Sequence, residues 1–257
     1  MPRTKFVDFN WPKLITKRSL DRVKWRKLSR CKDRLANSKV KSVCLILEKY
    51  LDKHKHSLFT RQHRDAKGKK TFDLQGSWKI GHGSTQVGHK QHVGKKRFFE
   101  MHNFKDTGVH LRPVETQEIT PKSLRFRKLK CYLLAKTILQ KIDPTFASGP
   151  FIVQFAMMSS PDHKVERHVD RDDITHQYVL SLGAFKNARF VIEEPEAPNP
   201  LRFDTRHKML RVDGRNPHWV ENDGFEGERF TVIFYKGYDF NFKEPAPRQA
   251  PEVVFEF

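Results

Sequence analysis

The chain has 257 residues, enough for one large domain or two small ones, and a hydrophobic share of 37% allows a buried core. A charged share of 31% without low-complexity repeats excludes a fibrous or a fully disordered chain. No apolar run reaches the ~18–20 residues of a membrane span, and the N-terminus lacks an apolar signal segment. We therefore expect an intracellular protein without membrane contact. The three separated cysteines indicate reduced thiols and neither a disulfide framework nor a zinc site: Cys31, Cys44 and Cys131.

The positive charge is confined to the first part of the chain. Residues 1–150 carry 36 Lys and Arg against 12 Asp and Glu, a net charge of +24, whereas residues 151–257 carry 14 against 18, a net charge of −4. This segregation predicts a polyanionic partner, with nucleic acid as the favoured class. Among nucleic acids we expect DNA ahead of RNA. A merely soluble basic surface is the plainer alternative. Short basic runs such as GKKR would fit a nuclear location in a eukaryotic cell.

Three helical patterns and one irregular segment precede the strands. Residues 20–36 combine spaced apolar side chains with many Lys and Arg, which is typical of a basic amphipathic helix. A second helix is expected over 38–54, with Ser38 as its candidate N-cap, and a third over 121–142. Residues 55–120 are basic and glycine-rich without a clear period, so a loop and a set of short strands both stay open.

From Gly149 onward, short apolar segments alternate with turn material and predict a compact antiparallel sandwich or barrel. The last segment is apolar on both faces, so we expect it to lie centrally in its sheet. Residues 199–206, 213–216 (DGRN) and 222–227 are interpreted as turns, and the proline-rich residues 244–254 as an extended tail. The expected strands cover residues 150–158, 164–170, 176–183, 188–194, 207–213, 217–221 and 228–238.

One set of residues in these strands indicates a metal site. His168 and Asp170 form an H-x-D pair, and alternate side chains of a strand point the same way, so both can face one ion. His218, at the start of another strand, completes a two-histidine, one-carboxylate set that suits non-haem Fe(II). Arg229 and Thr231 also alternate on one strand, and a guanidinium beside a hydroxyl can hold a carboxylate.

These motifs resemble the core of the Fe(II)/2-oxoglutarate-dependent oxygenases over roughly residues 150–240. Three segments are similar to the TET/JBP group of nucleic-acid oxygenases in particular: HVDRDDITHQYVLSLGAF, FDTRHKMLRVDGRNPHWV and GERFTVIFYKGYD. The sequence departs from that group in having Lys186-Asn187-Ala188 where a glycine pair often follows the LSLGxF strand.

The resemblance implies an α+β fold with a double-stranded β-helix core, also described as jelly-roll or cupin-like, and flanking N-terminal helices. Residues 1–148 would form a basic, helical and loop-rich region that packs on the core, and residues 149–257 the oxygenase core with its extended C-terminal tail. The implied cofactors and co-substrates are Fe(II), 2-oxoglutarate and O2. The implied site comprises His168, Asp170 and His218 as metal ligands and catalytic residues, and Arg229, Thr231 and Tyr178 as contacts of 2-oxoglutarate.

The activity implied is oxidation of a methylated pyrimidine base in nucleic acid. One alternative is a protein side-chain hydroxylase of the same superfamily, acting on proline or lysine. Another is a non-catalytic, basic nucleic-acid-binding module on an oxygenase scaffold. The sequence leaves the oligomeric state open.

Several other residues keep two interpretations. Tyr178 and Ser181 can contact a co-substrate or serve in the strand, and Arg215 can face a substrate or belong to a turn. Trp78 can stack on a base or lie in the core. Turn or supporting roles are considered for Asp172 and Asp173. Three histidines are interpreted as solvated or facing nucleic acid: His82, His89 and His92.

Overall fold

The computed structural model describes residues 34–64, 70–74, 76–82, 98–104, 108–113, 124–149, 151–171, 173–236 and 246–257. Most of the expected helix over residues 20–36 lies outside these ranges. The same holds for other residues singled out in the sequence: Cys31, His89, His92 and Asp172.

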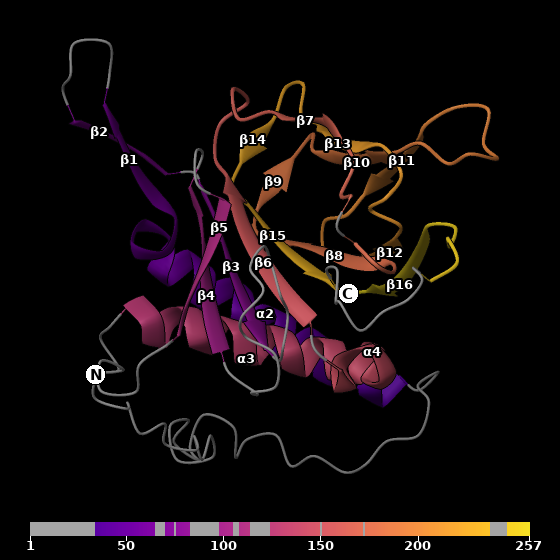
Figure 1. Ribbon diagram of the computed structural model, residues 1–257, viewed down its shortest axis with the longest axis horizontal. Helices are drawn as coiled ribbons and strands as arrows, with labels where there is room; N and C mark the ends of the chain where they lie inside the picture. Colours follow the sequence, from indigo (N-terminus) through magenta and orange to yellow (C-terminus); the bar gives the residue numbers. More distant parts are fainter. Residues whose placement is uncertain are drawn as a thin grey trace.

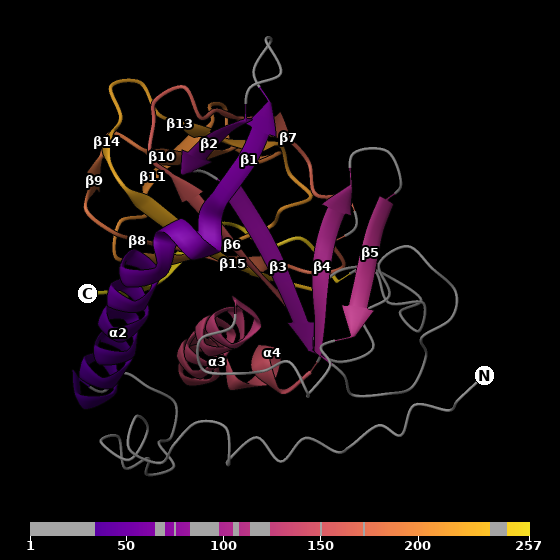
Figure 2. The same ribbon diagram turned by 90° about the vertical axis from the view of Figure 1, so that its left-hand side faces the viewer.

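The described part of the chain has three layers, which Figures 1 and 2 show from two sides. Two long helices and one short helix cover one face of a large antiparallel sheet, and a smaller antiparallel sheet packs on its other face. The helices are α2 (Arg34–Phe59), α3 (Leu124–Ile142) and α4 (Pro144–Ser148). None of the helices in the described ranges is long and apolar enough to cross a membrane.

The large sheet has eight strands, and the small sheet has four. In spatial order, the large sheet contains β16 (Glu252–Glu256), β12 (Lys208–Val212), β8 (Gln177–Leu182), β15 (Arg229–Tyr235), β6 (Phe151–Met158), β3 (Gly76–His82), β4 (Phe98–Phe104) and β5 (Gly108–Pro113). The small sheet contains β11 (Leu201–Asp204), β10 (Arg189–Ile192), β13 (His218–Glu221) and β7 (Val165–His168). Two further pairs are β1 (Thr60–Arg64) with β2 (Lys70–Leu74), and β9 (Phe185–Lys186) with β14 (Glu226–Gly227).

Side chains that alternate along the central strands contribute to two different buried regions, one between the large sheet and the helices and one between the two sheets. On β15, Phe230, Val232 and Phe234 point toward the helices and belong to the main hydrophobic core. Arg229 and Ile233 lie on the opposite face, because successive side chains of a strand point to opposite sides. There the two sheets meet through a second, smaller apolar cluster: Val179, Phe190, Ile192, Leu210 and Val212.

The seven strands expected after residue 149 are confirmed as β6, β7, β8, β10, β12, β13 and β15, and β15 does lie centrally, between β8 and β6. The interpretation of residues 199–206 as a turn is wrong, because they contain β11. The tail contains β16, which pairs with β12. Helices and antiparallel sheets together confirm the α+β class.

Before residue 149, the structure decides between the alternatives for residues 55–120: residues 55–59 continue α2, and the rest of the described part forms the strands β1 to β5. Three of them, β3 to β5, extend the large sheet beyond β6, since β3 pairs with β6 along seven residues. Helix α2 begins at Arg34, so Ser38 lies inside the helix and is not its N-cap. The third helix ends at Ile142, as expected, and Asp143 then caps α4 by accepting a hydrogen bond from the Phe146 backbone N–H.

Candidate metal centre

The three expected metal ligands come together at one end of the small sheet. His218, the first residue of β13, pairs directly with His168, the last residue of β7, and their ring centroids are 4.3 Å apart. Asp170 lies two residues beyond the end of β7, with its carboxylate oxygens 4.0 Å from His168 Nε2 and 3.5 Å from His218 Nε2. One ligand atom from each residue lies within 4.8 Å of the others.

This spacing fits a single ion. Two ligand atoms at right angles on one ion, each about 2.1 Å from it, are about 3 Å apart, so the observed 3.5 and 4.0 Å need only a small contraction. Two imidazoles and one carboxylate on one side of an ion leave positions open opposite them, which is the donor set of non-haem Fe(II) sites.

Backbone carbonyls orient both imidazoles. His168 Nδ1 lies 2.7 Å from the Glu166 carbonyl oxygen, and His218 Nδ1 lies 2.9 Å from the Asn216 carbonyl oxygen. A carbonyl oxygen only accepts, so each Nδ1 carries the proton and donates. Each Nε2 then faces the Asp170 carboxylate, on the side where a shared metal ion would be bound.

Asp170 lies beyond the end of β7 and is held by the loop over residues 213–217 and by Gln177, the first residue of β8. Its backbone N–H donates to the Gly214 carbonyl at 2.8 Å, and the Gln177 Nε2 donates to its Oδ2 at 3.1 Å. A Cβ at Gly214 would lie 2.0 Å from Gln177 Nε2 and 3.0 Å from Asp170 Oδ2. A side chain at position 214 would therefore displace the Gln177 amide that donates to Asp170. The sequence analysis placed Asp170 beside His168 by alternation within one strand. That reason is wrong, because β7 ends at His168 and the loop positions Asp170.

The centre is open on one side. His218 is buried, whereas the side chains of His168 and Asp170 are 45% and 40% exposed, so an ion there would be accessible from solvent. Burial alone would raise the pKa of Asp170, but hydrogen bonding to and the charge of His218, with smaller contributions from Gln177 and His168, hold it below its usual value. Asp170 is thus an ionised carboxylate at neutral pH, as a metal ligand must be.

Arg229 is a buried cation in the space between the two sheets. Its Nε and Nη2 donate to Ser181 Oγ at 3.2 and 3.1 Å, and Nη2 also reaches Thr205 Oγ1 at 3.4 Å. Burial lowers the pKa of Arg229 to about 10, and Asp204 only partly opposes this shift. Within the part of the chain that the structure describes, no carboxylate lies within ion-pair distance of it. A buried guanidinium in this state is suited to an anionic ligand.

The other two expected contacts of 2-oxoglutarate lie in different places. Thr231 shares the face of β15 with Arg229, but the hydroxyls that contact the guanidinium are those of Ser181 and Thr205. Tyr178 points the other way from Ser181, into the helix-facing core, where its hydroxyl donates to Asp143 Oδ2 at 2.7 Å. This position corrects the expectation that Tyr178 contacts a co-substrate.

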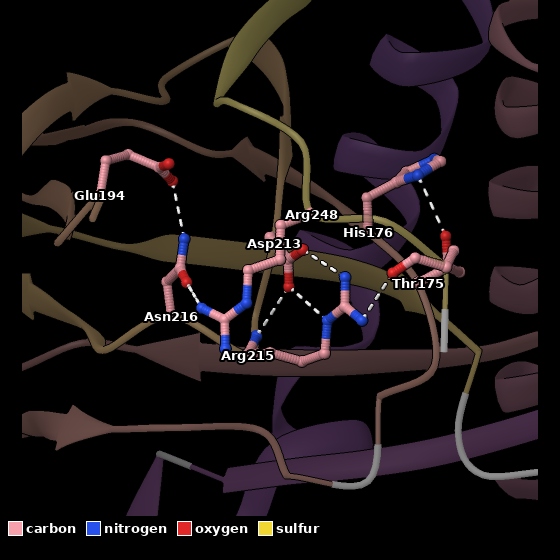
Figure 3. Close-up of polar contacts among 8 residues, drawn as sticks. Thr175, His176, Glu194, Asp213, Arg215, Asn216 and Arg248 are labelled. Atoms are coloured by element: carbon pink, nitrogen blue, oxygen red, sulfur yellow. Dashed lines mark hydrogen bonds and ion pairs between the residues drawn. The ribbon is translucent and has the colours of Figure 1, made fainter. Parts of the chain in front are cut away.

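Three residues with two interpretations now have one. Arg215 is a loop residue, because its Nε and Nη2 donate to the two oxygens of Asp213 and its Nη1 to the Ala246 carbonyl (Figure 3). Trp78 is a core residue stacked on Phe155, with ring centroids 4.3 Å apart. Asp173 is buried beside the centre, and burial, with the charge of Asp170 adding to it, raises the pKa of Asp173 to about 8.

Sequence reasoning missed Thr205 and Asn216. Thr205 lies in the segment interpreted as a turn, and its hydroxyl is 2.8 Å from that of Ser181. Asn216 belongs to the DGRN segment, also interpreted as a turn, and its backbone orients His218. Neither residue has a motif of its own, but the position of Asn216 two residues before His218 is the one signal that could have drawn attention to it.

Comparisons with known proteins do not assign the chain to a family. No family model matches it, and no curated protein does. Among solved structures, a 2OG-Fe(II) oxygenase family oxidoreductase from Burkholderia pseudomallei is 16% identical, with 58% of this chain and 72% of that chain covered and a TM-score of 0.35. A bsmA homolog from Methylobium petroleophilum PM1 is 14% identical, with 82% and 89% covered and a TM-score of 0.38.

A cupin superfamily protein from Desulfitobacterium hafniense DCB-2 is 9% identical, with 34% of this chain and 68% of that chain covered and a TM-score of 0.24. Similarity at this level establishes neither a family nor an activity. The functional conclusion therefore depends on the chain's own residues.

Proposed function

We propose that this protein is an Fe(II)- and 2-oxoglutarate-dependent dioxygenase, and that its two facing sheets form a double-stranded β-helix. The observation that carries the proposal is a pair of sites with complementary chemistry. His168, Asp170 and His218 offer three ligand atoms within 4.8 Å of one another, and Arg229 is a buried cation without a carboxylate partner in the described residues. An ion alone would not explain the buried guanidinium, whereas a diacid that binds both would.

In this proposal each side chain has a distinct task. His168, Asp170 and His218 would hold the ion through two imidazoles and one carboxylate. When bound, the iron and 2-oxoglutarate supply the oxidising chemistry, in which O2 oxidises the keto acid to succinate and carbon dioxide and hydroxylates a substrate. Arg229 binds the distal carboxylate of 2-oxoglutarate, with the Ser181 and Thr205 hydroxyls holding the guanidinium in place.

We further propose that the substrate is a methylated pyrimidine in nucleic acid, DNA in preference to RNA, as the similarity to the TET/JBP group in the sequence segments suggests. The charge of +24 on residues 1–150 supports a polyanion. In Figures 1 and 2 the hairpin β1–β2 extends to the level of the small sheet, whereas α2 and α3 lie beyond the other face of the large sheet. By the position of its backbone, the hairpin is better placed than the helices to contact a nucleic-acid strand near the metal centre.

The experiment is succinate release from 2-oxoglutarate by the full chain with Fe(II), O2 and pools of methylated DNA, RNA and peptides, with modified products identified by mass spectrometry. We expect succinate release that requires Fe(II), is lost in His168→Ala and persists in His56→Ala, which removes an exposed helix histidine. Oxidised bases in the DNA pool would support the substrate assignment.

Other outcomes would redirect or overturn the proposal. Hydroxylated peptides with unchanged nucleic acid would retain the chemistry and overturn the substrate. Absence of iron binding and turnover, together with tight and salt-sensitive DNA binding, would overturn the enzyme and favour a binding module.

A further inference from the structure

The loop over residues 213–217 contacts two of the three proposed metal ligands. Its Gly214 carbonyl accepts from the Asp170 backbone N–H at 2.8 Å, and its Asn216 carbonyl accepts from His218 Nδ1 at 2.9 Å. The Pro217 carbonyl also accepts from the Glu193 N–H at 2.9 Å, which joins the loop to the end of β10. The position of this loop therefore determines the relative position of Asp170 and the His218 ring.

Asn216 is fully buried, and both polar atoms of its side chain are used. Its Nδ2 donates to Glu194 Oε1 at 2.9 Å, and its Oδ1 accepts a hydrogen bond from Nη1 of Arg248. Its backbone N–H donates to the Asp213 carbonyl at 3.0 Å. Figure 3 shows the Asn216 side chain between Glu194 on one side and Arg248 on the other. A side chain held at both ends leaves its own carbonyl, which orients His218, little freedom to rotate.

The C-terminal segment reaches this loop at a second point. Arg215 Nη1 donates to the Ala246 carbonyl at 2.8 Å, and the Ala246 N–H donates to the Ile174 carbonyl at 2.8 Å. Arg215 is itself paired with Asp213, whose carboxylate is fully buried. Residues 246–248 thus connect the loop that orients His218 with the chain that follows Asp170.

We propose that Arg248 is a positioning residue of the metal centre: by holding the side chain of Asn216, it sets the orientation of the His218 imidazole toward the ion. The inference rests on the proposed metal site but does not depend on the reaction or the substrate. Arg248 lies at the surface, far along the sequence from any ligand, and no motif of the H-x-D or R-x-T kind includes it.

The physical consequence of losing Arg248 is specific. Asn216 Oδ1 would be left in a buried position without its donor, and a buried acceptor without a partner is unfavourable, so the amide would rotate or the loop would move to admit water. Either change displaces the Asn216 carbonyl from His218 Nδ1. Groups that orient a metal-ligating histidine typically contribute roughly 10–100-fold to metal affinity. Arg248 does not contact His218 itself but acts through the Asn216 side chain, so its contribution should be smaller. We therefore expect roughly a three- to tenfold loss of affinity in Arg248→Ala.

The test is a titration of the full-length apoprotein with Co(II), which reports affinity and, through its visible spectrum, ligand geometry. Arg248→Ala should bind Co(II) roughly three- to tenfold more weakly and change the spectrum, and Arg248→Lys, which retains a donor, should recover part of both. The matched control is Arg202→Ala, which removes a guanidinium bound to Glu221 on the same strand as His218. This control should leave affinity and spectrum unchanged.

A second readout uses the apoprotein alone. In Arg248→Ala, the His218 Nδ1–H signal in a ¹⁵N NMR spectrum should broaden or move, while that of His168, held by Glu166, should not. Equal Co(II) affinity, spectrum and His218 signal in Arg248→Ala and wild type would overturn the inference. Wild-type protein that binds Co(II) but releases no succinate would instead overturn the proposed function and leave this inference standing.

Discussion

The two faces of the eight-stranded sheet use the same strands for opposite purposes. The helix-facing side is apolar: Leu180, Leu182 and Val232 are fully buried there among aromatic rings. The other side carries Gln177, Ser181 and Arg229, residues that a protein core would not select for stability. The difference shows that one face holds the fold together, whereas the other accepts hydrogen-bonded polar groups and the buried charge of Arg229, which has no carboxylate partner in the described residues.

The largest effect is expected on the helix-facing side. Phe234→Ala removes a fully buried ring that packs beside Phe151, and the free energy of unfolding should fall by about 3–5 kcal/mol in chemical denaturation. Metal affinity of the protein that remains folded should be unchanged. If Phe234→Ala is fully folded but binds metal much more weakly than wild type, the two faces of the sheet are coupled and do not have separate roles.

The next effect is expected at the metal centre. Asp170→Ala removes one of three ligands, so Co(II) affinity should fall by more than about a hundredfold, since even the groups behind a ligand contribute 10–100-fold. Thermal unfolding of the apoprotein should change little, because Asp170 is 40% exposed. Calorimetric titration with Co(II) measures the affinity. Unchanged affinity would mean that the three residues do not bind one ion.

Arg229 distinguishes the two faces of the sheet most clearly, because its buried charge should lower the free energy of unfolding. Arg229→Met replaces a buried guanidinium by an apolar side chain of similar length, and the Ser181 and Thr205 hydroxyls can still bond each other. We expect the free energy of unfolding to stay constant or to rise by about 1 kcal/mol. A fall of about 2 kcal/mol or more would identify Arg229 as a structural residue and remove the argument for an anionic ligand.

The smallest effect concerns His176, a partly buried histidine that directly precedes β8. Burial, with Arg211 as a smaller cause, lowers the pKa of His176, whose ring lies beside Phe146 and Tyr178. The unfolded chain then gains a proton at a higher pH than the folded one, so stability should decline as pH falls through the ordinary pKa of about 6.5. Denaturation at several pH values should show a flatter profile in His176→Gln. An identical slope in both proteins would mean that His176 remains accessible to protons.

The sequence predicted much of the second part of the fold and little of the first. Segments such as β6 and β15 are regular alternating or apolar runs, and those signals are local. The strands β3 to β5 lie in a glycine-rich, basic stretch without a period, and they form because β6 offers a free edge. No local pattern encodes that pairing.

The candidate site divides in the same way. The cluster of His168, Asp170 and His218 could be predicted because H-x-D and the later histidine are chemically specific residues at or just beyond the ends of strands. Thr205 and Asn216 could not, because their roles arise from contacts across 24 residues with Ser181 and across 32 residues with Arg248. Tyr178 was misplaced because a one-residue step along β8 moves a side chain to the opposite face.

The central claim is that one ion and one buried guanidinium together bind a diacid. The most direct test is calorimetric binding of 2-oxoglutarate, in the absence of oxygen, to protein with and without Mn(II). We predict binding only to the Mn(II)-loaded wild type, and at least about tenfold weaker binding in Arg229→Met at unchanged Mn(II) affinity. Failure of the Mn(II)-loaded wild type to bind 2-oxoglutarate, or equal binding by Arg229→Met, would contradict the account.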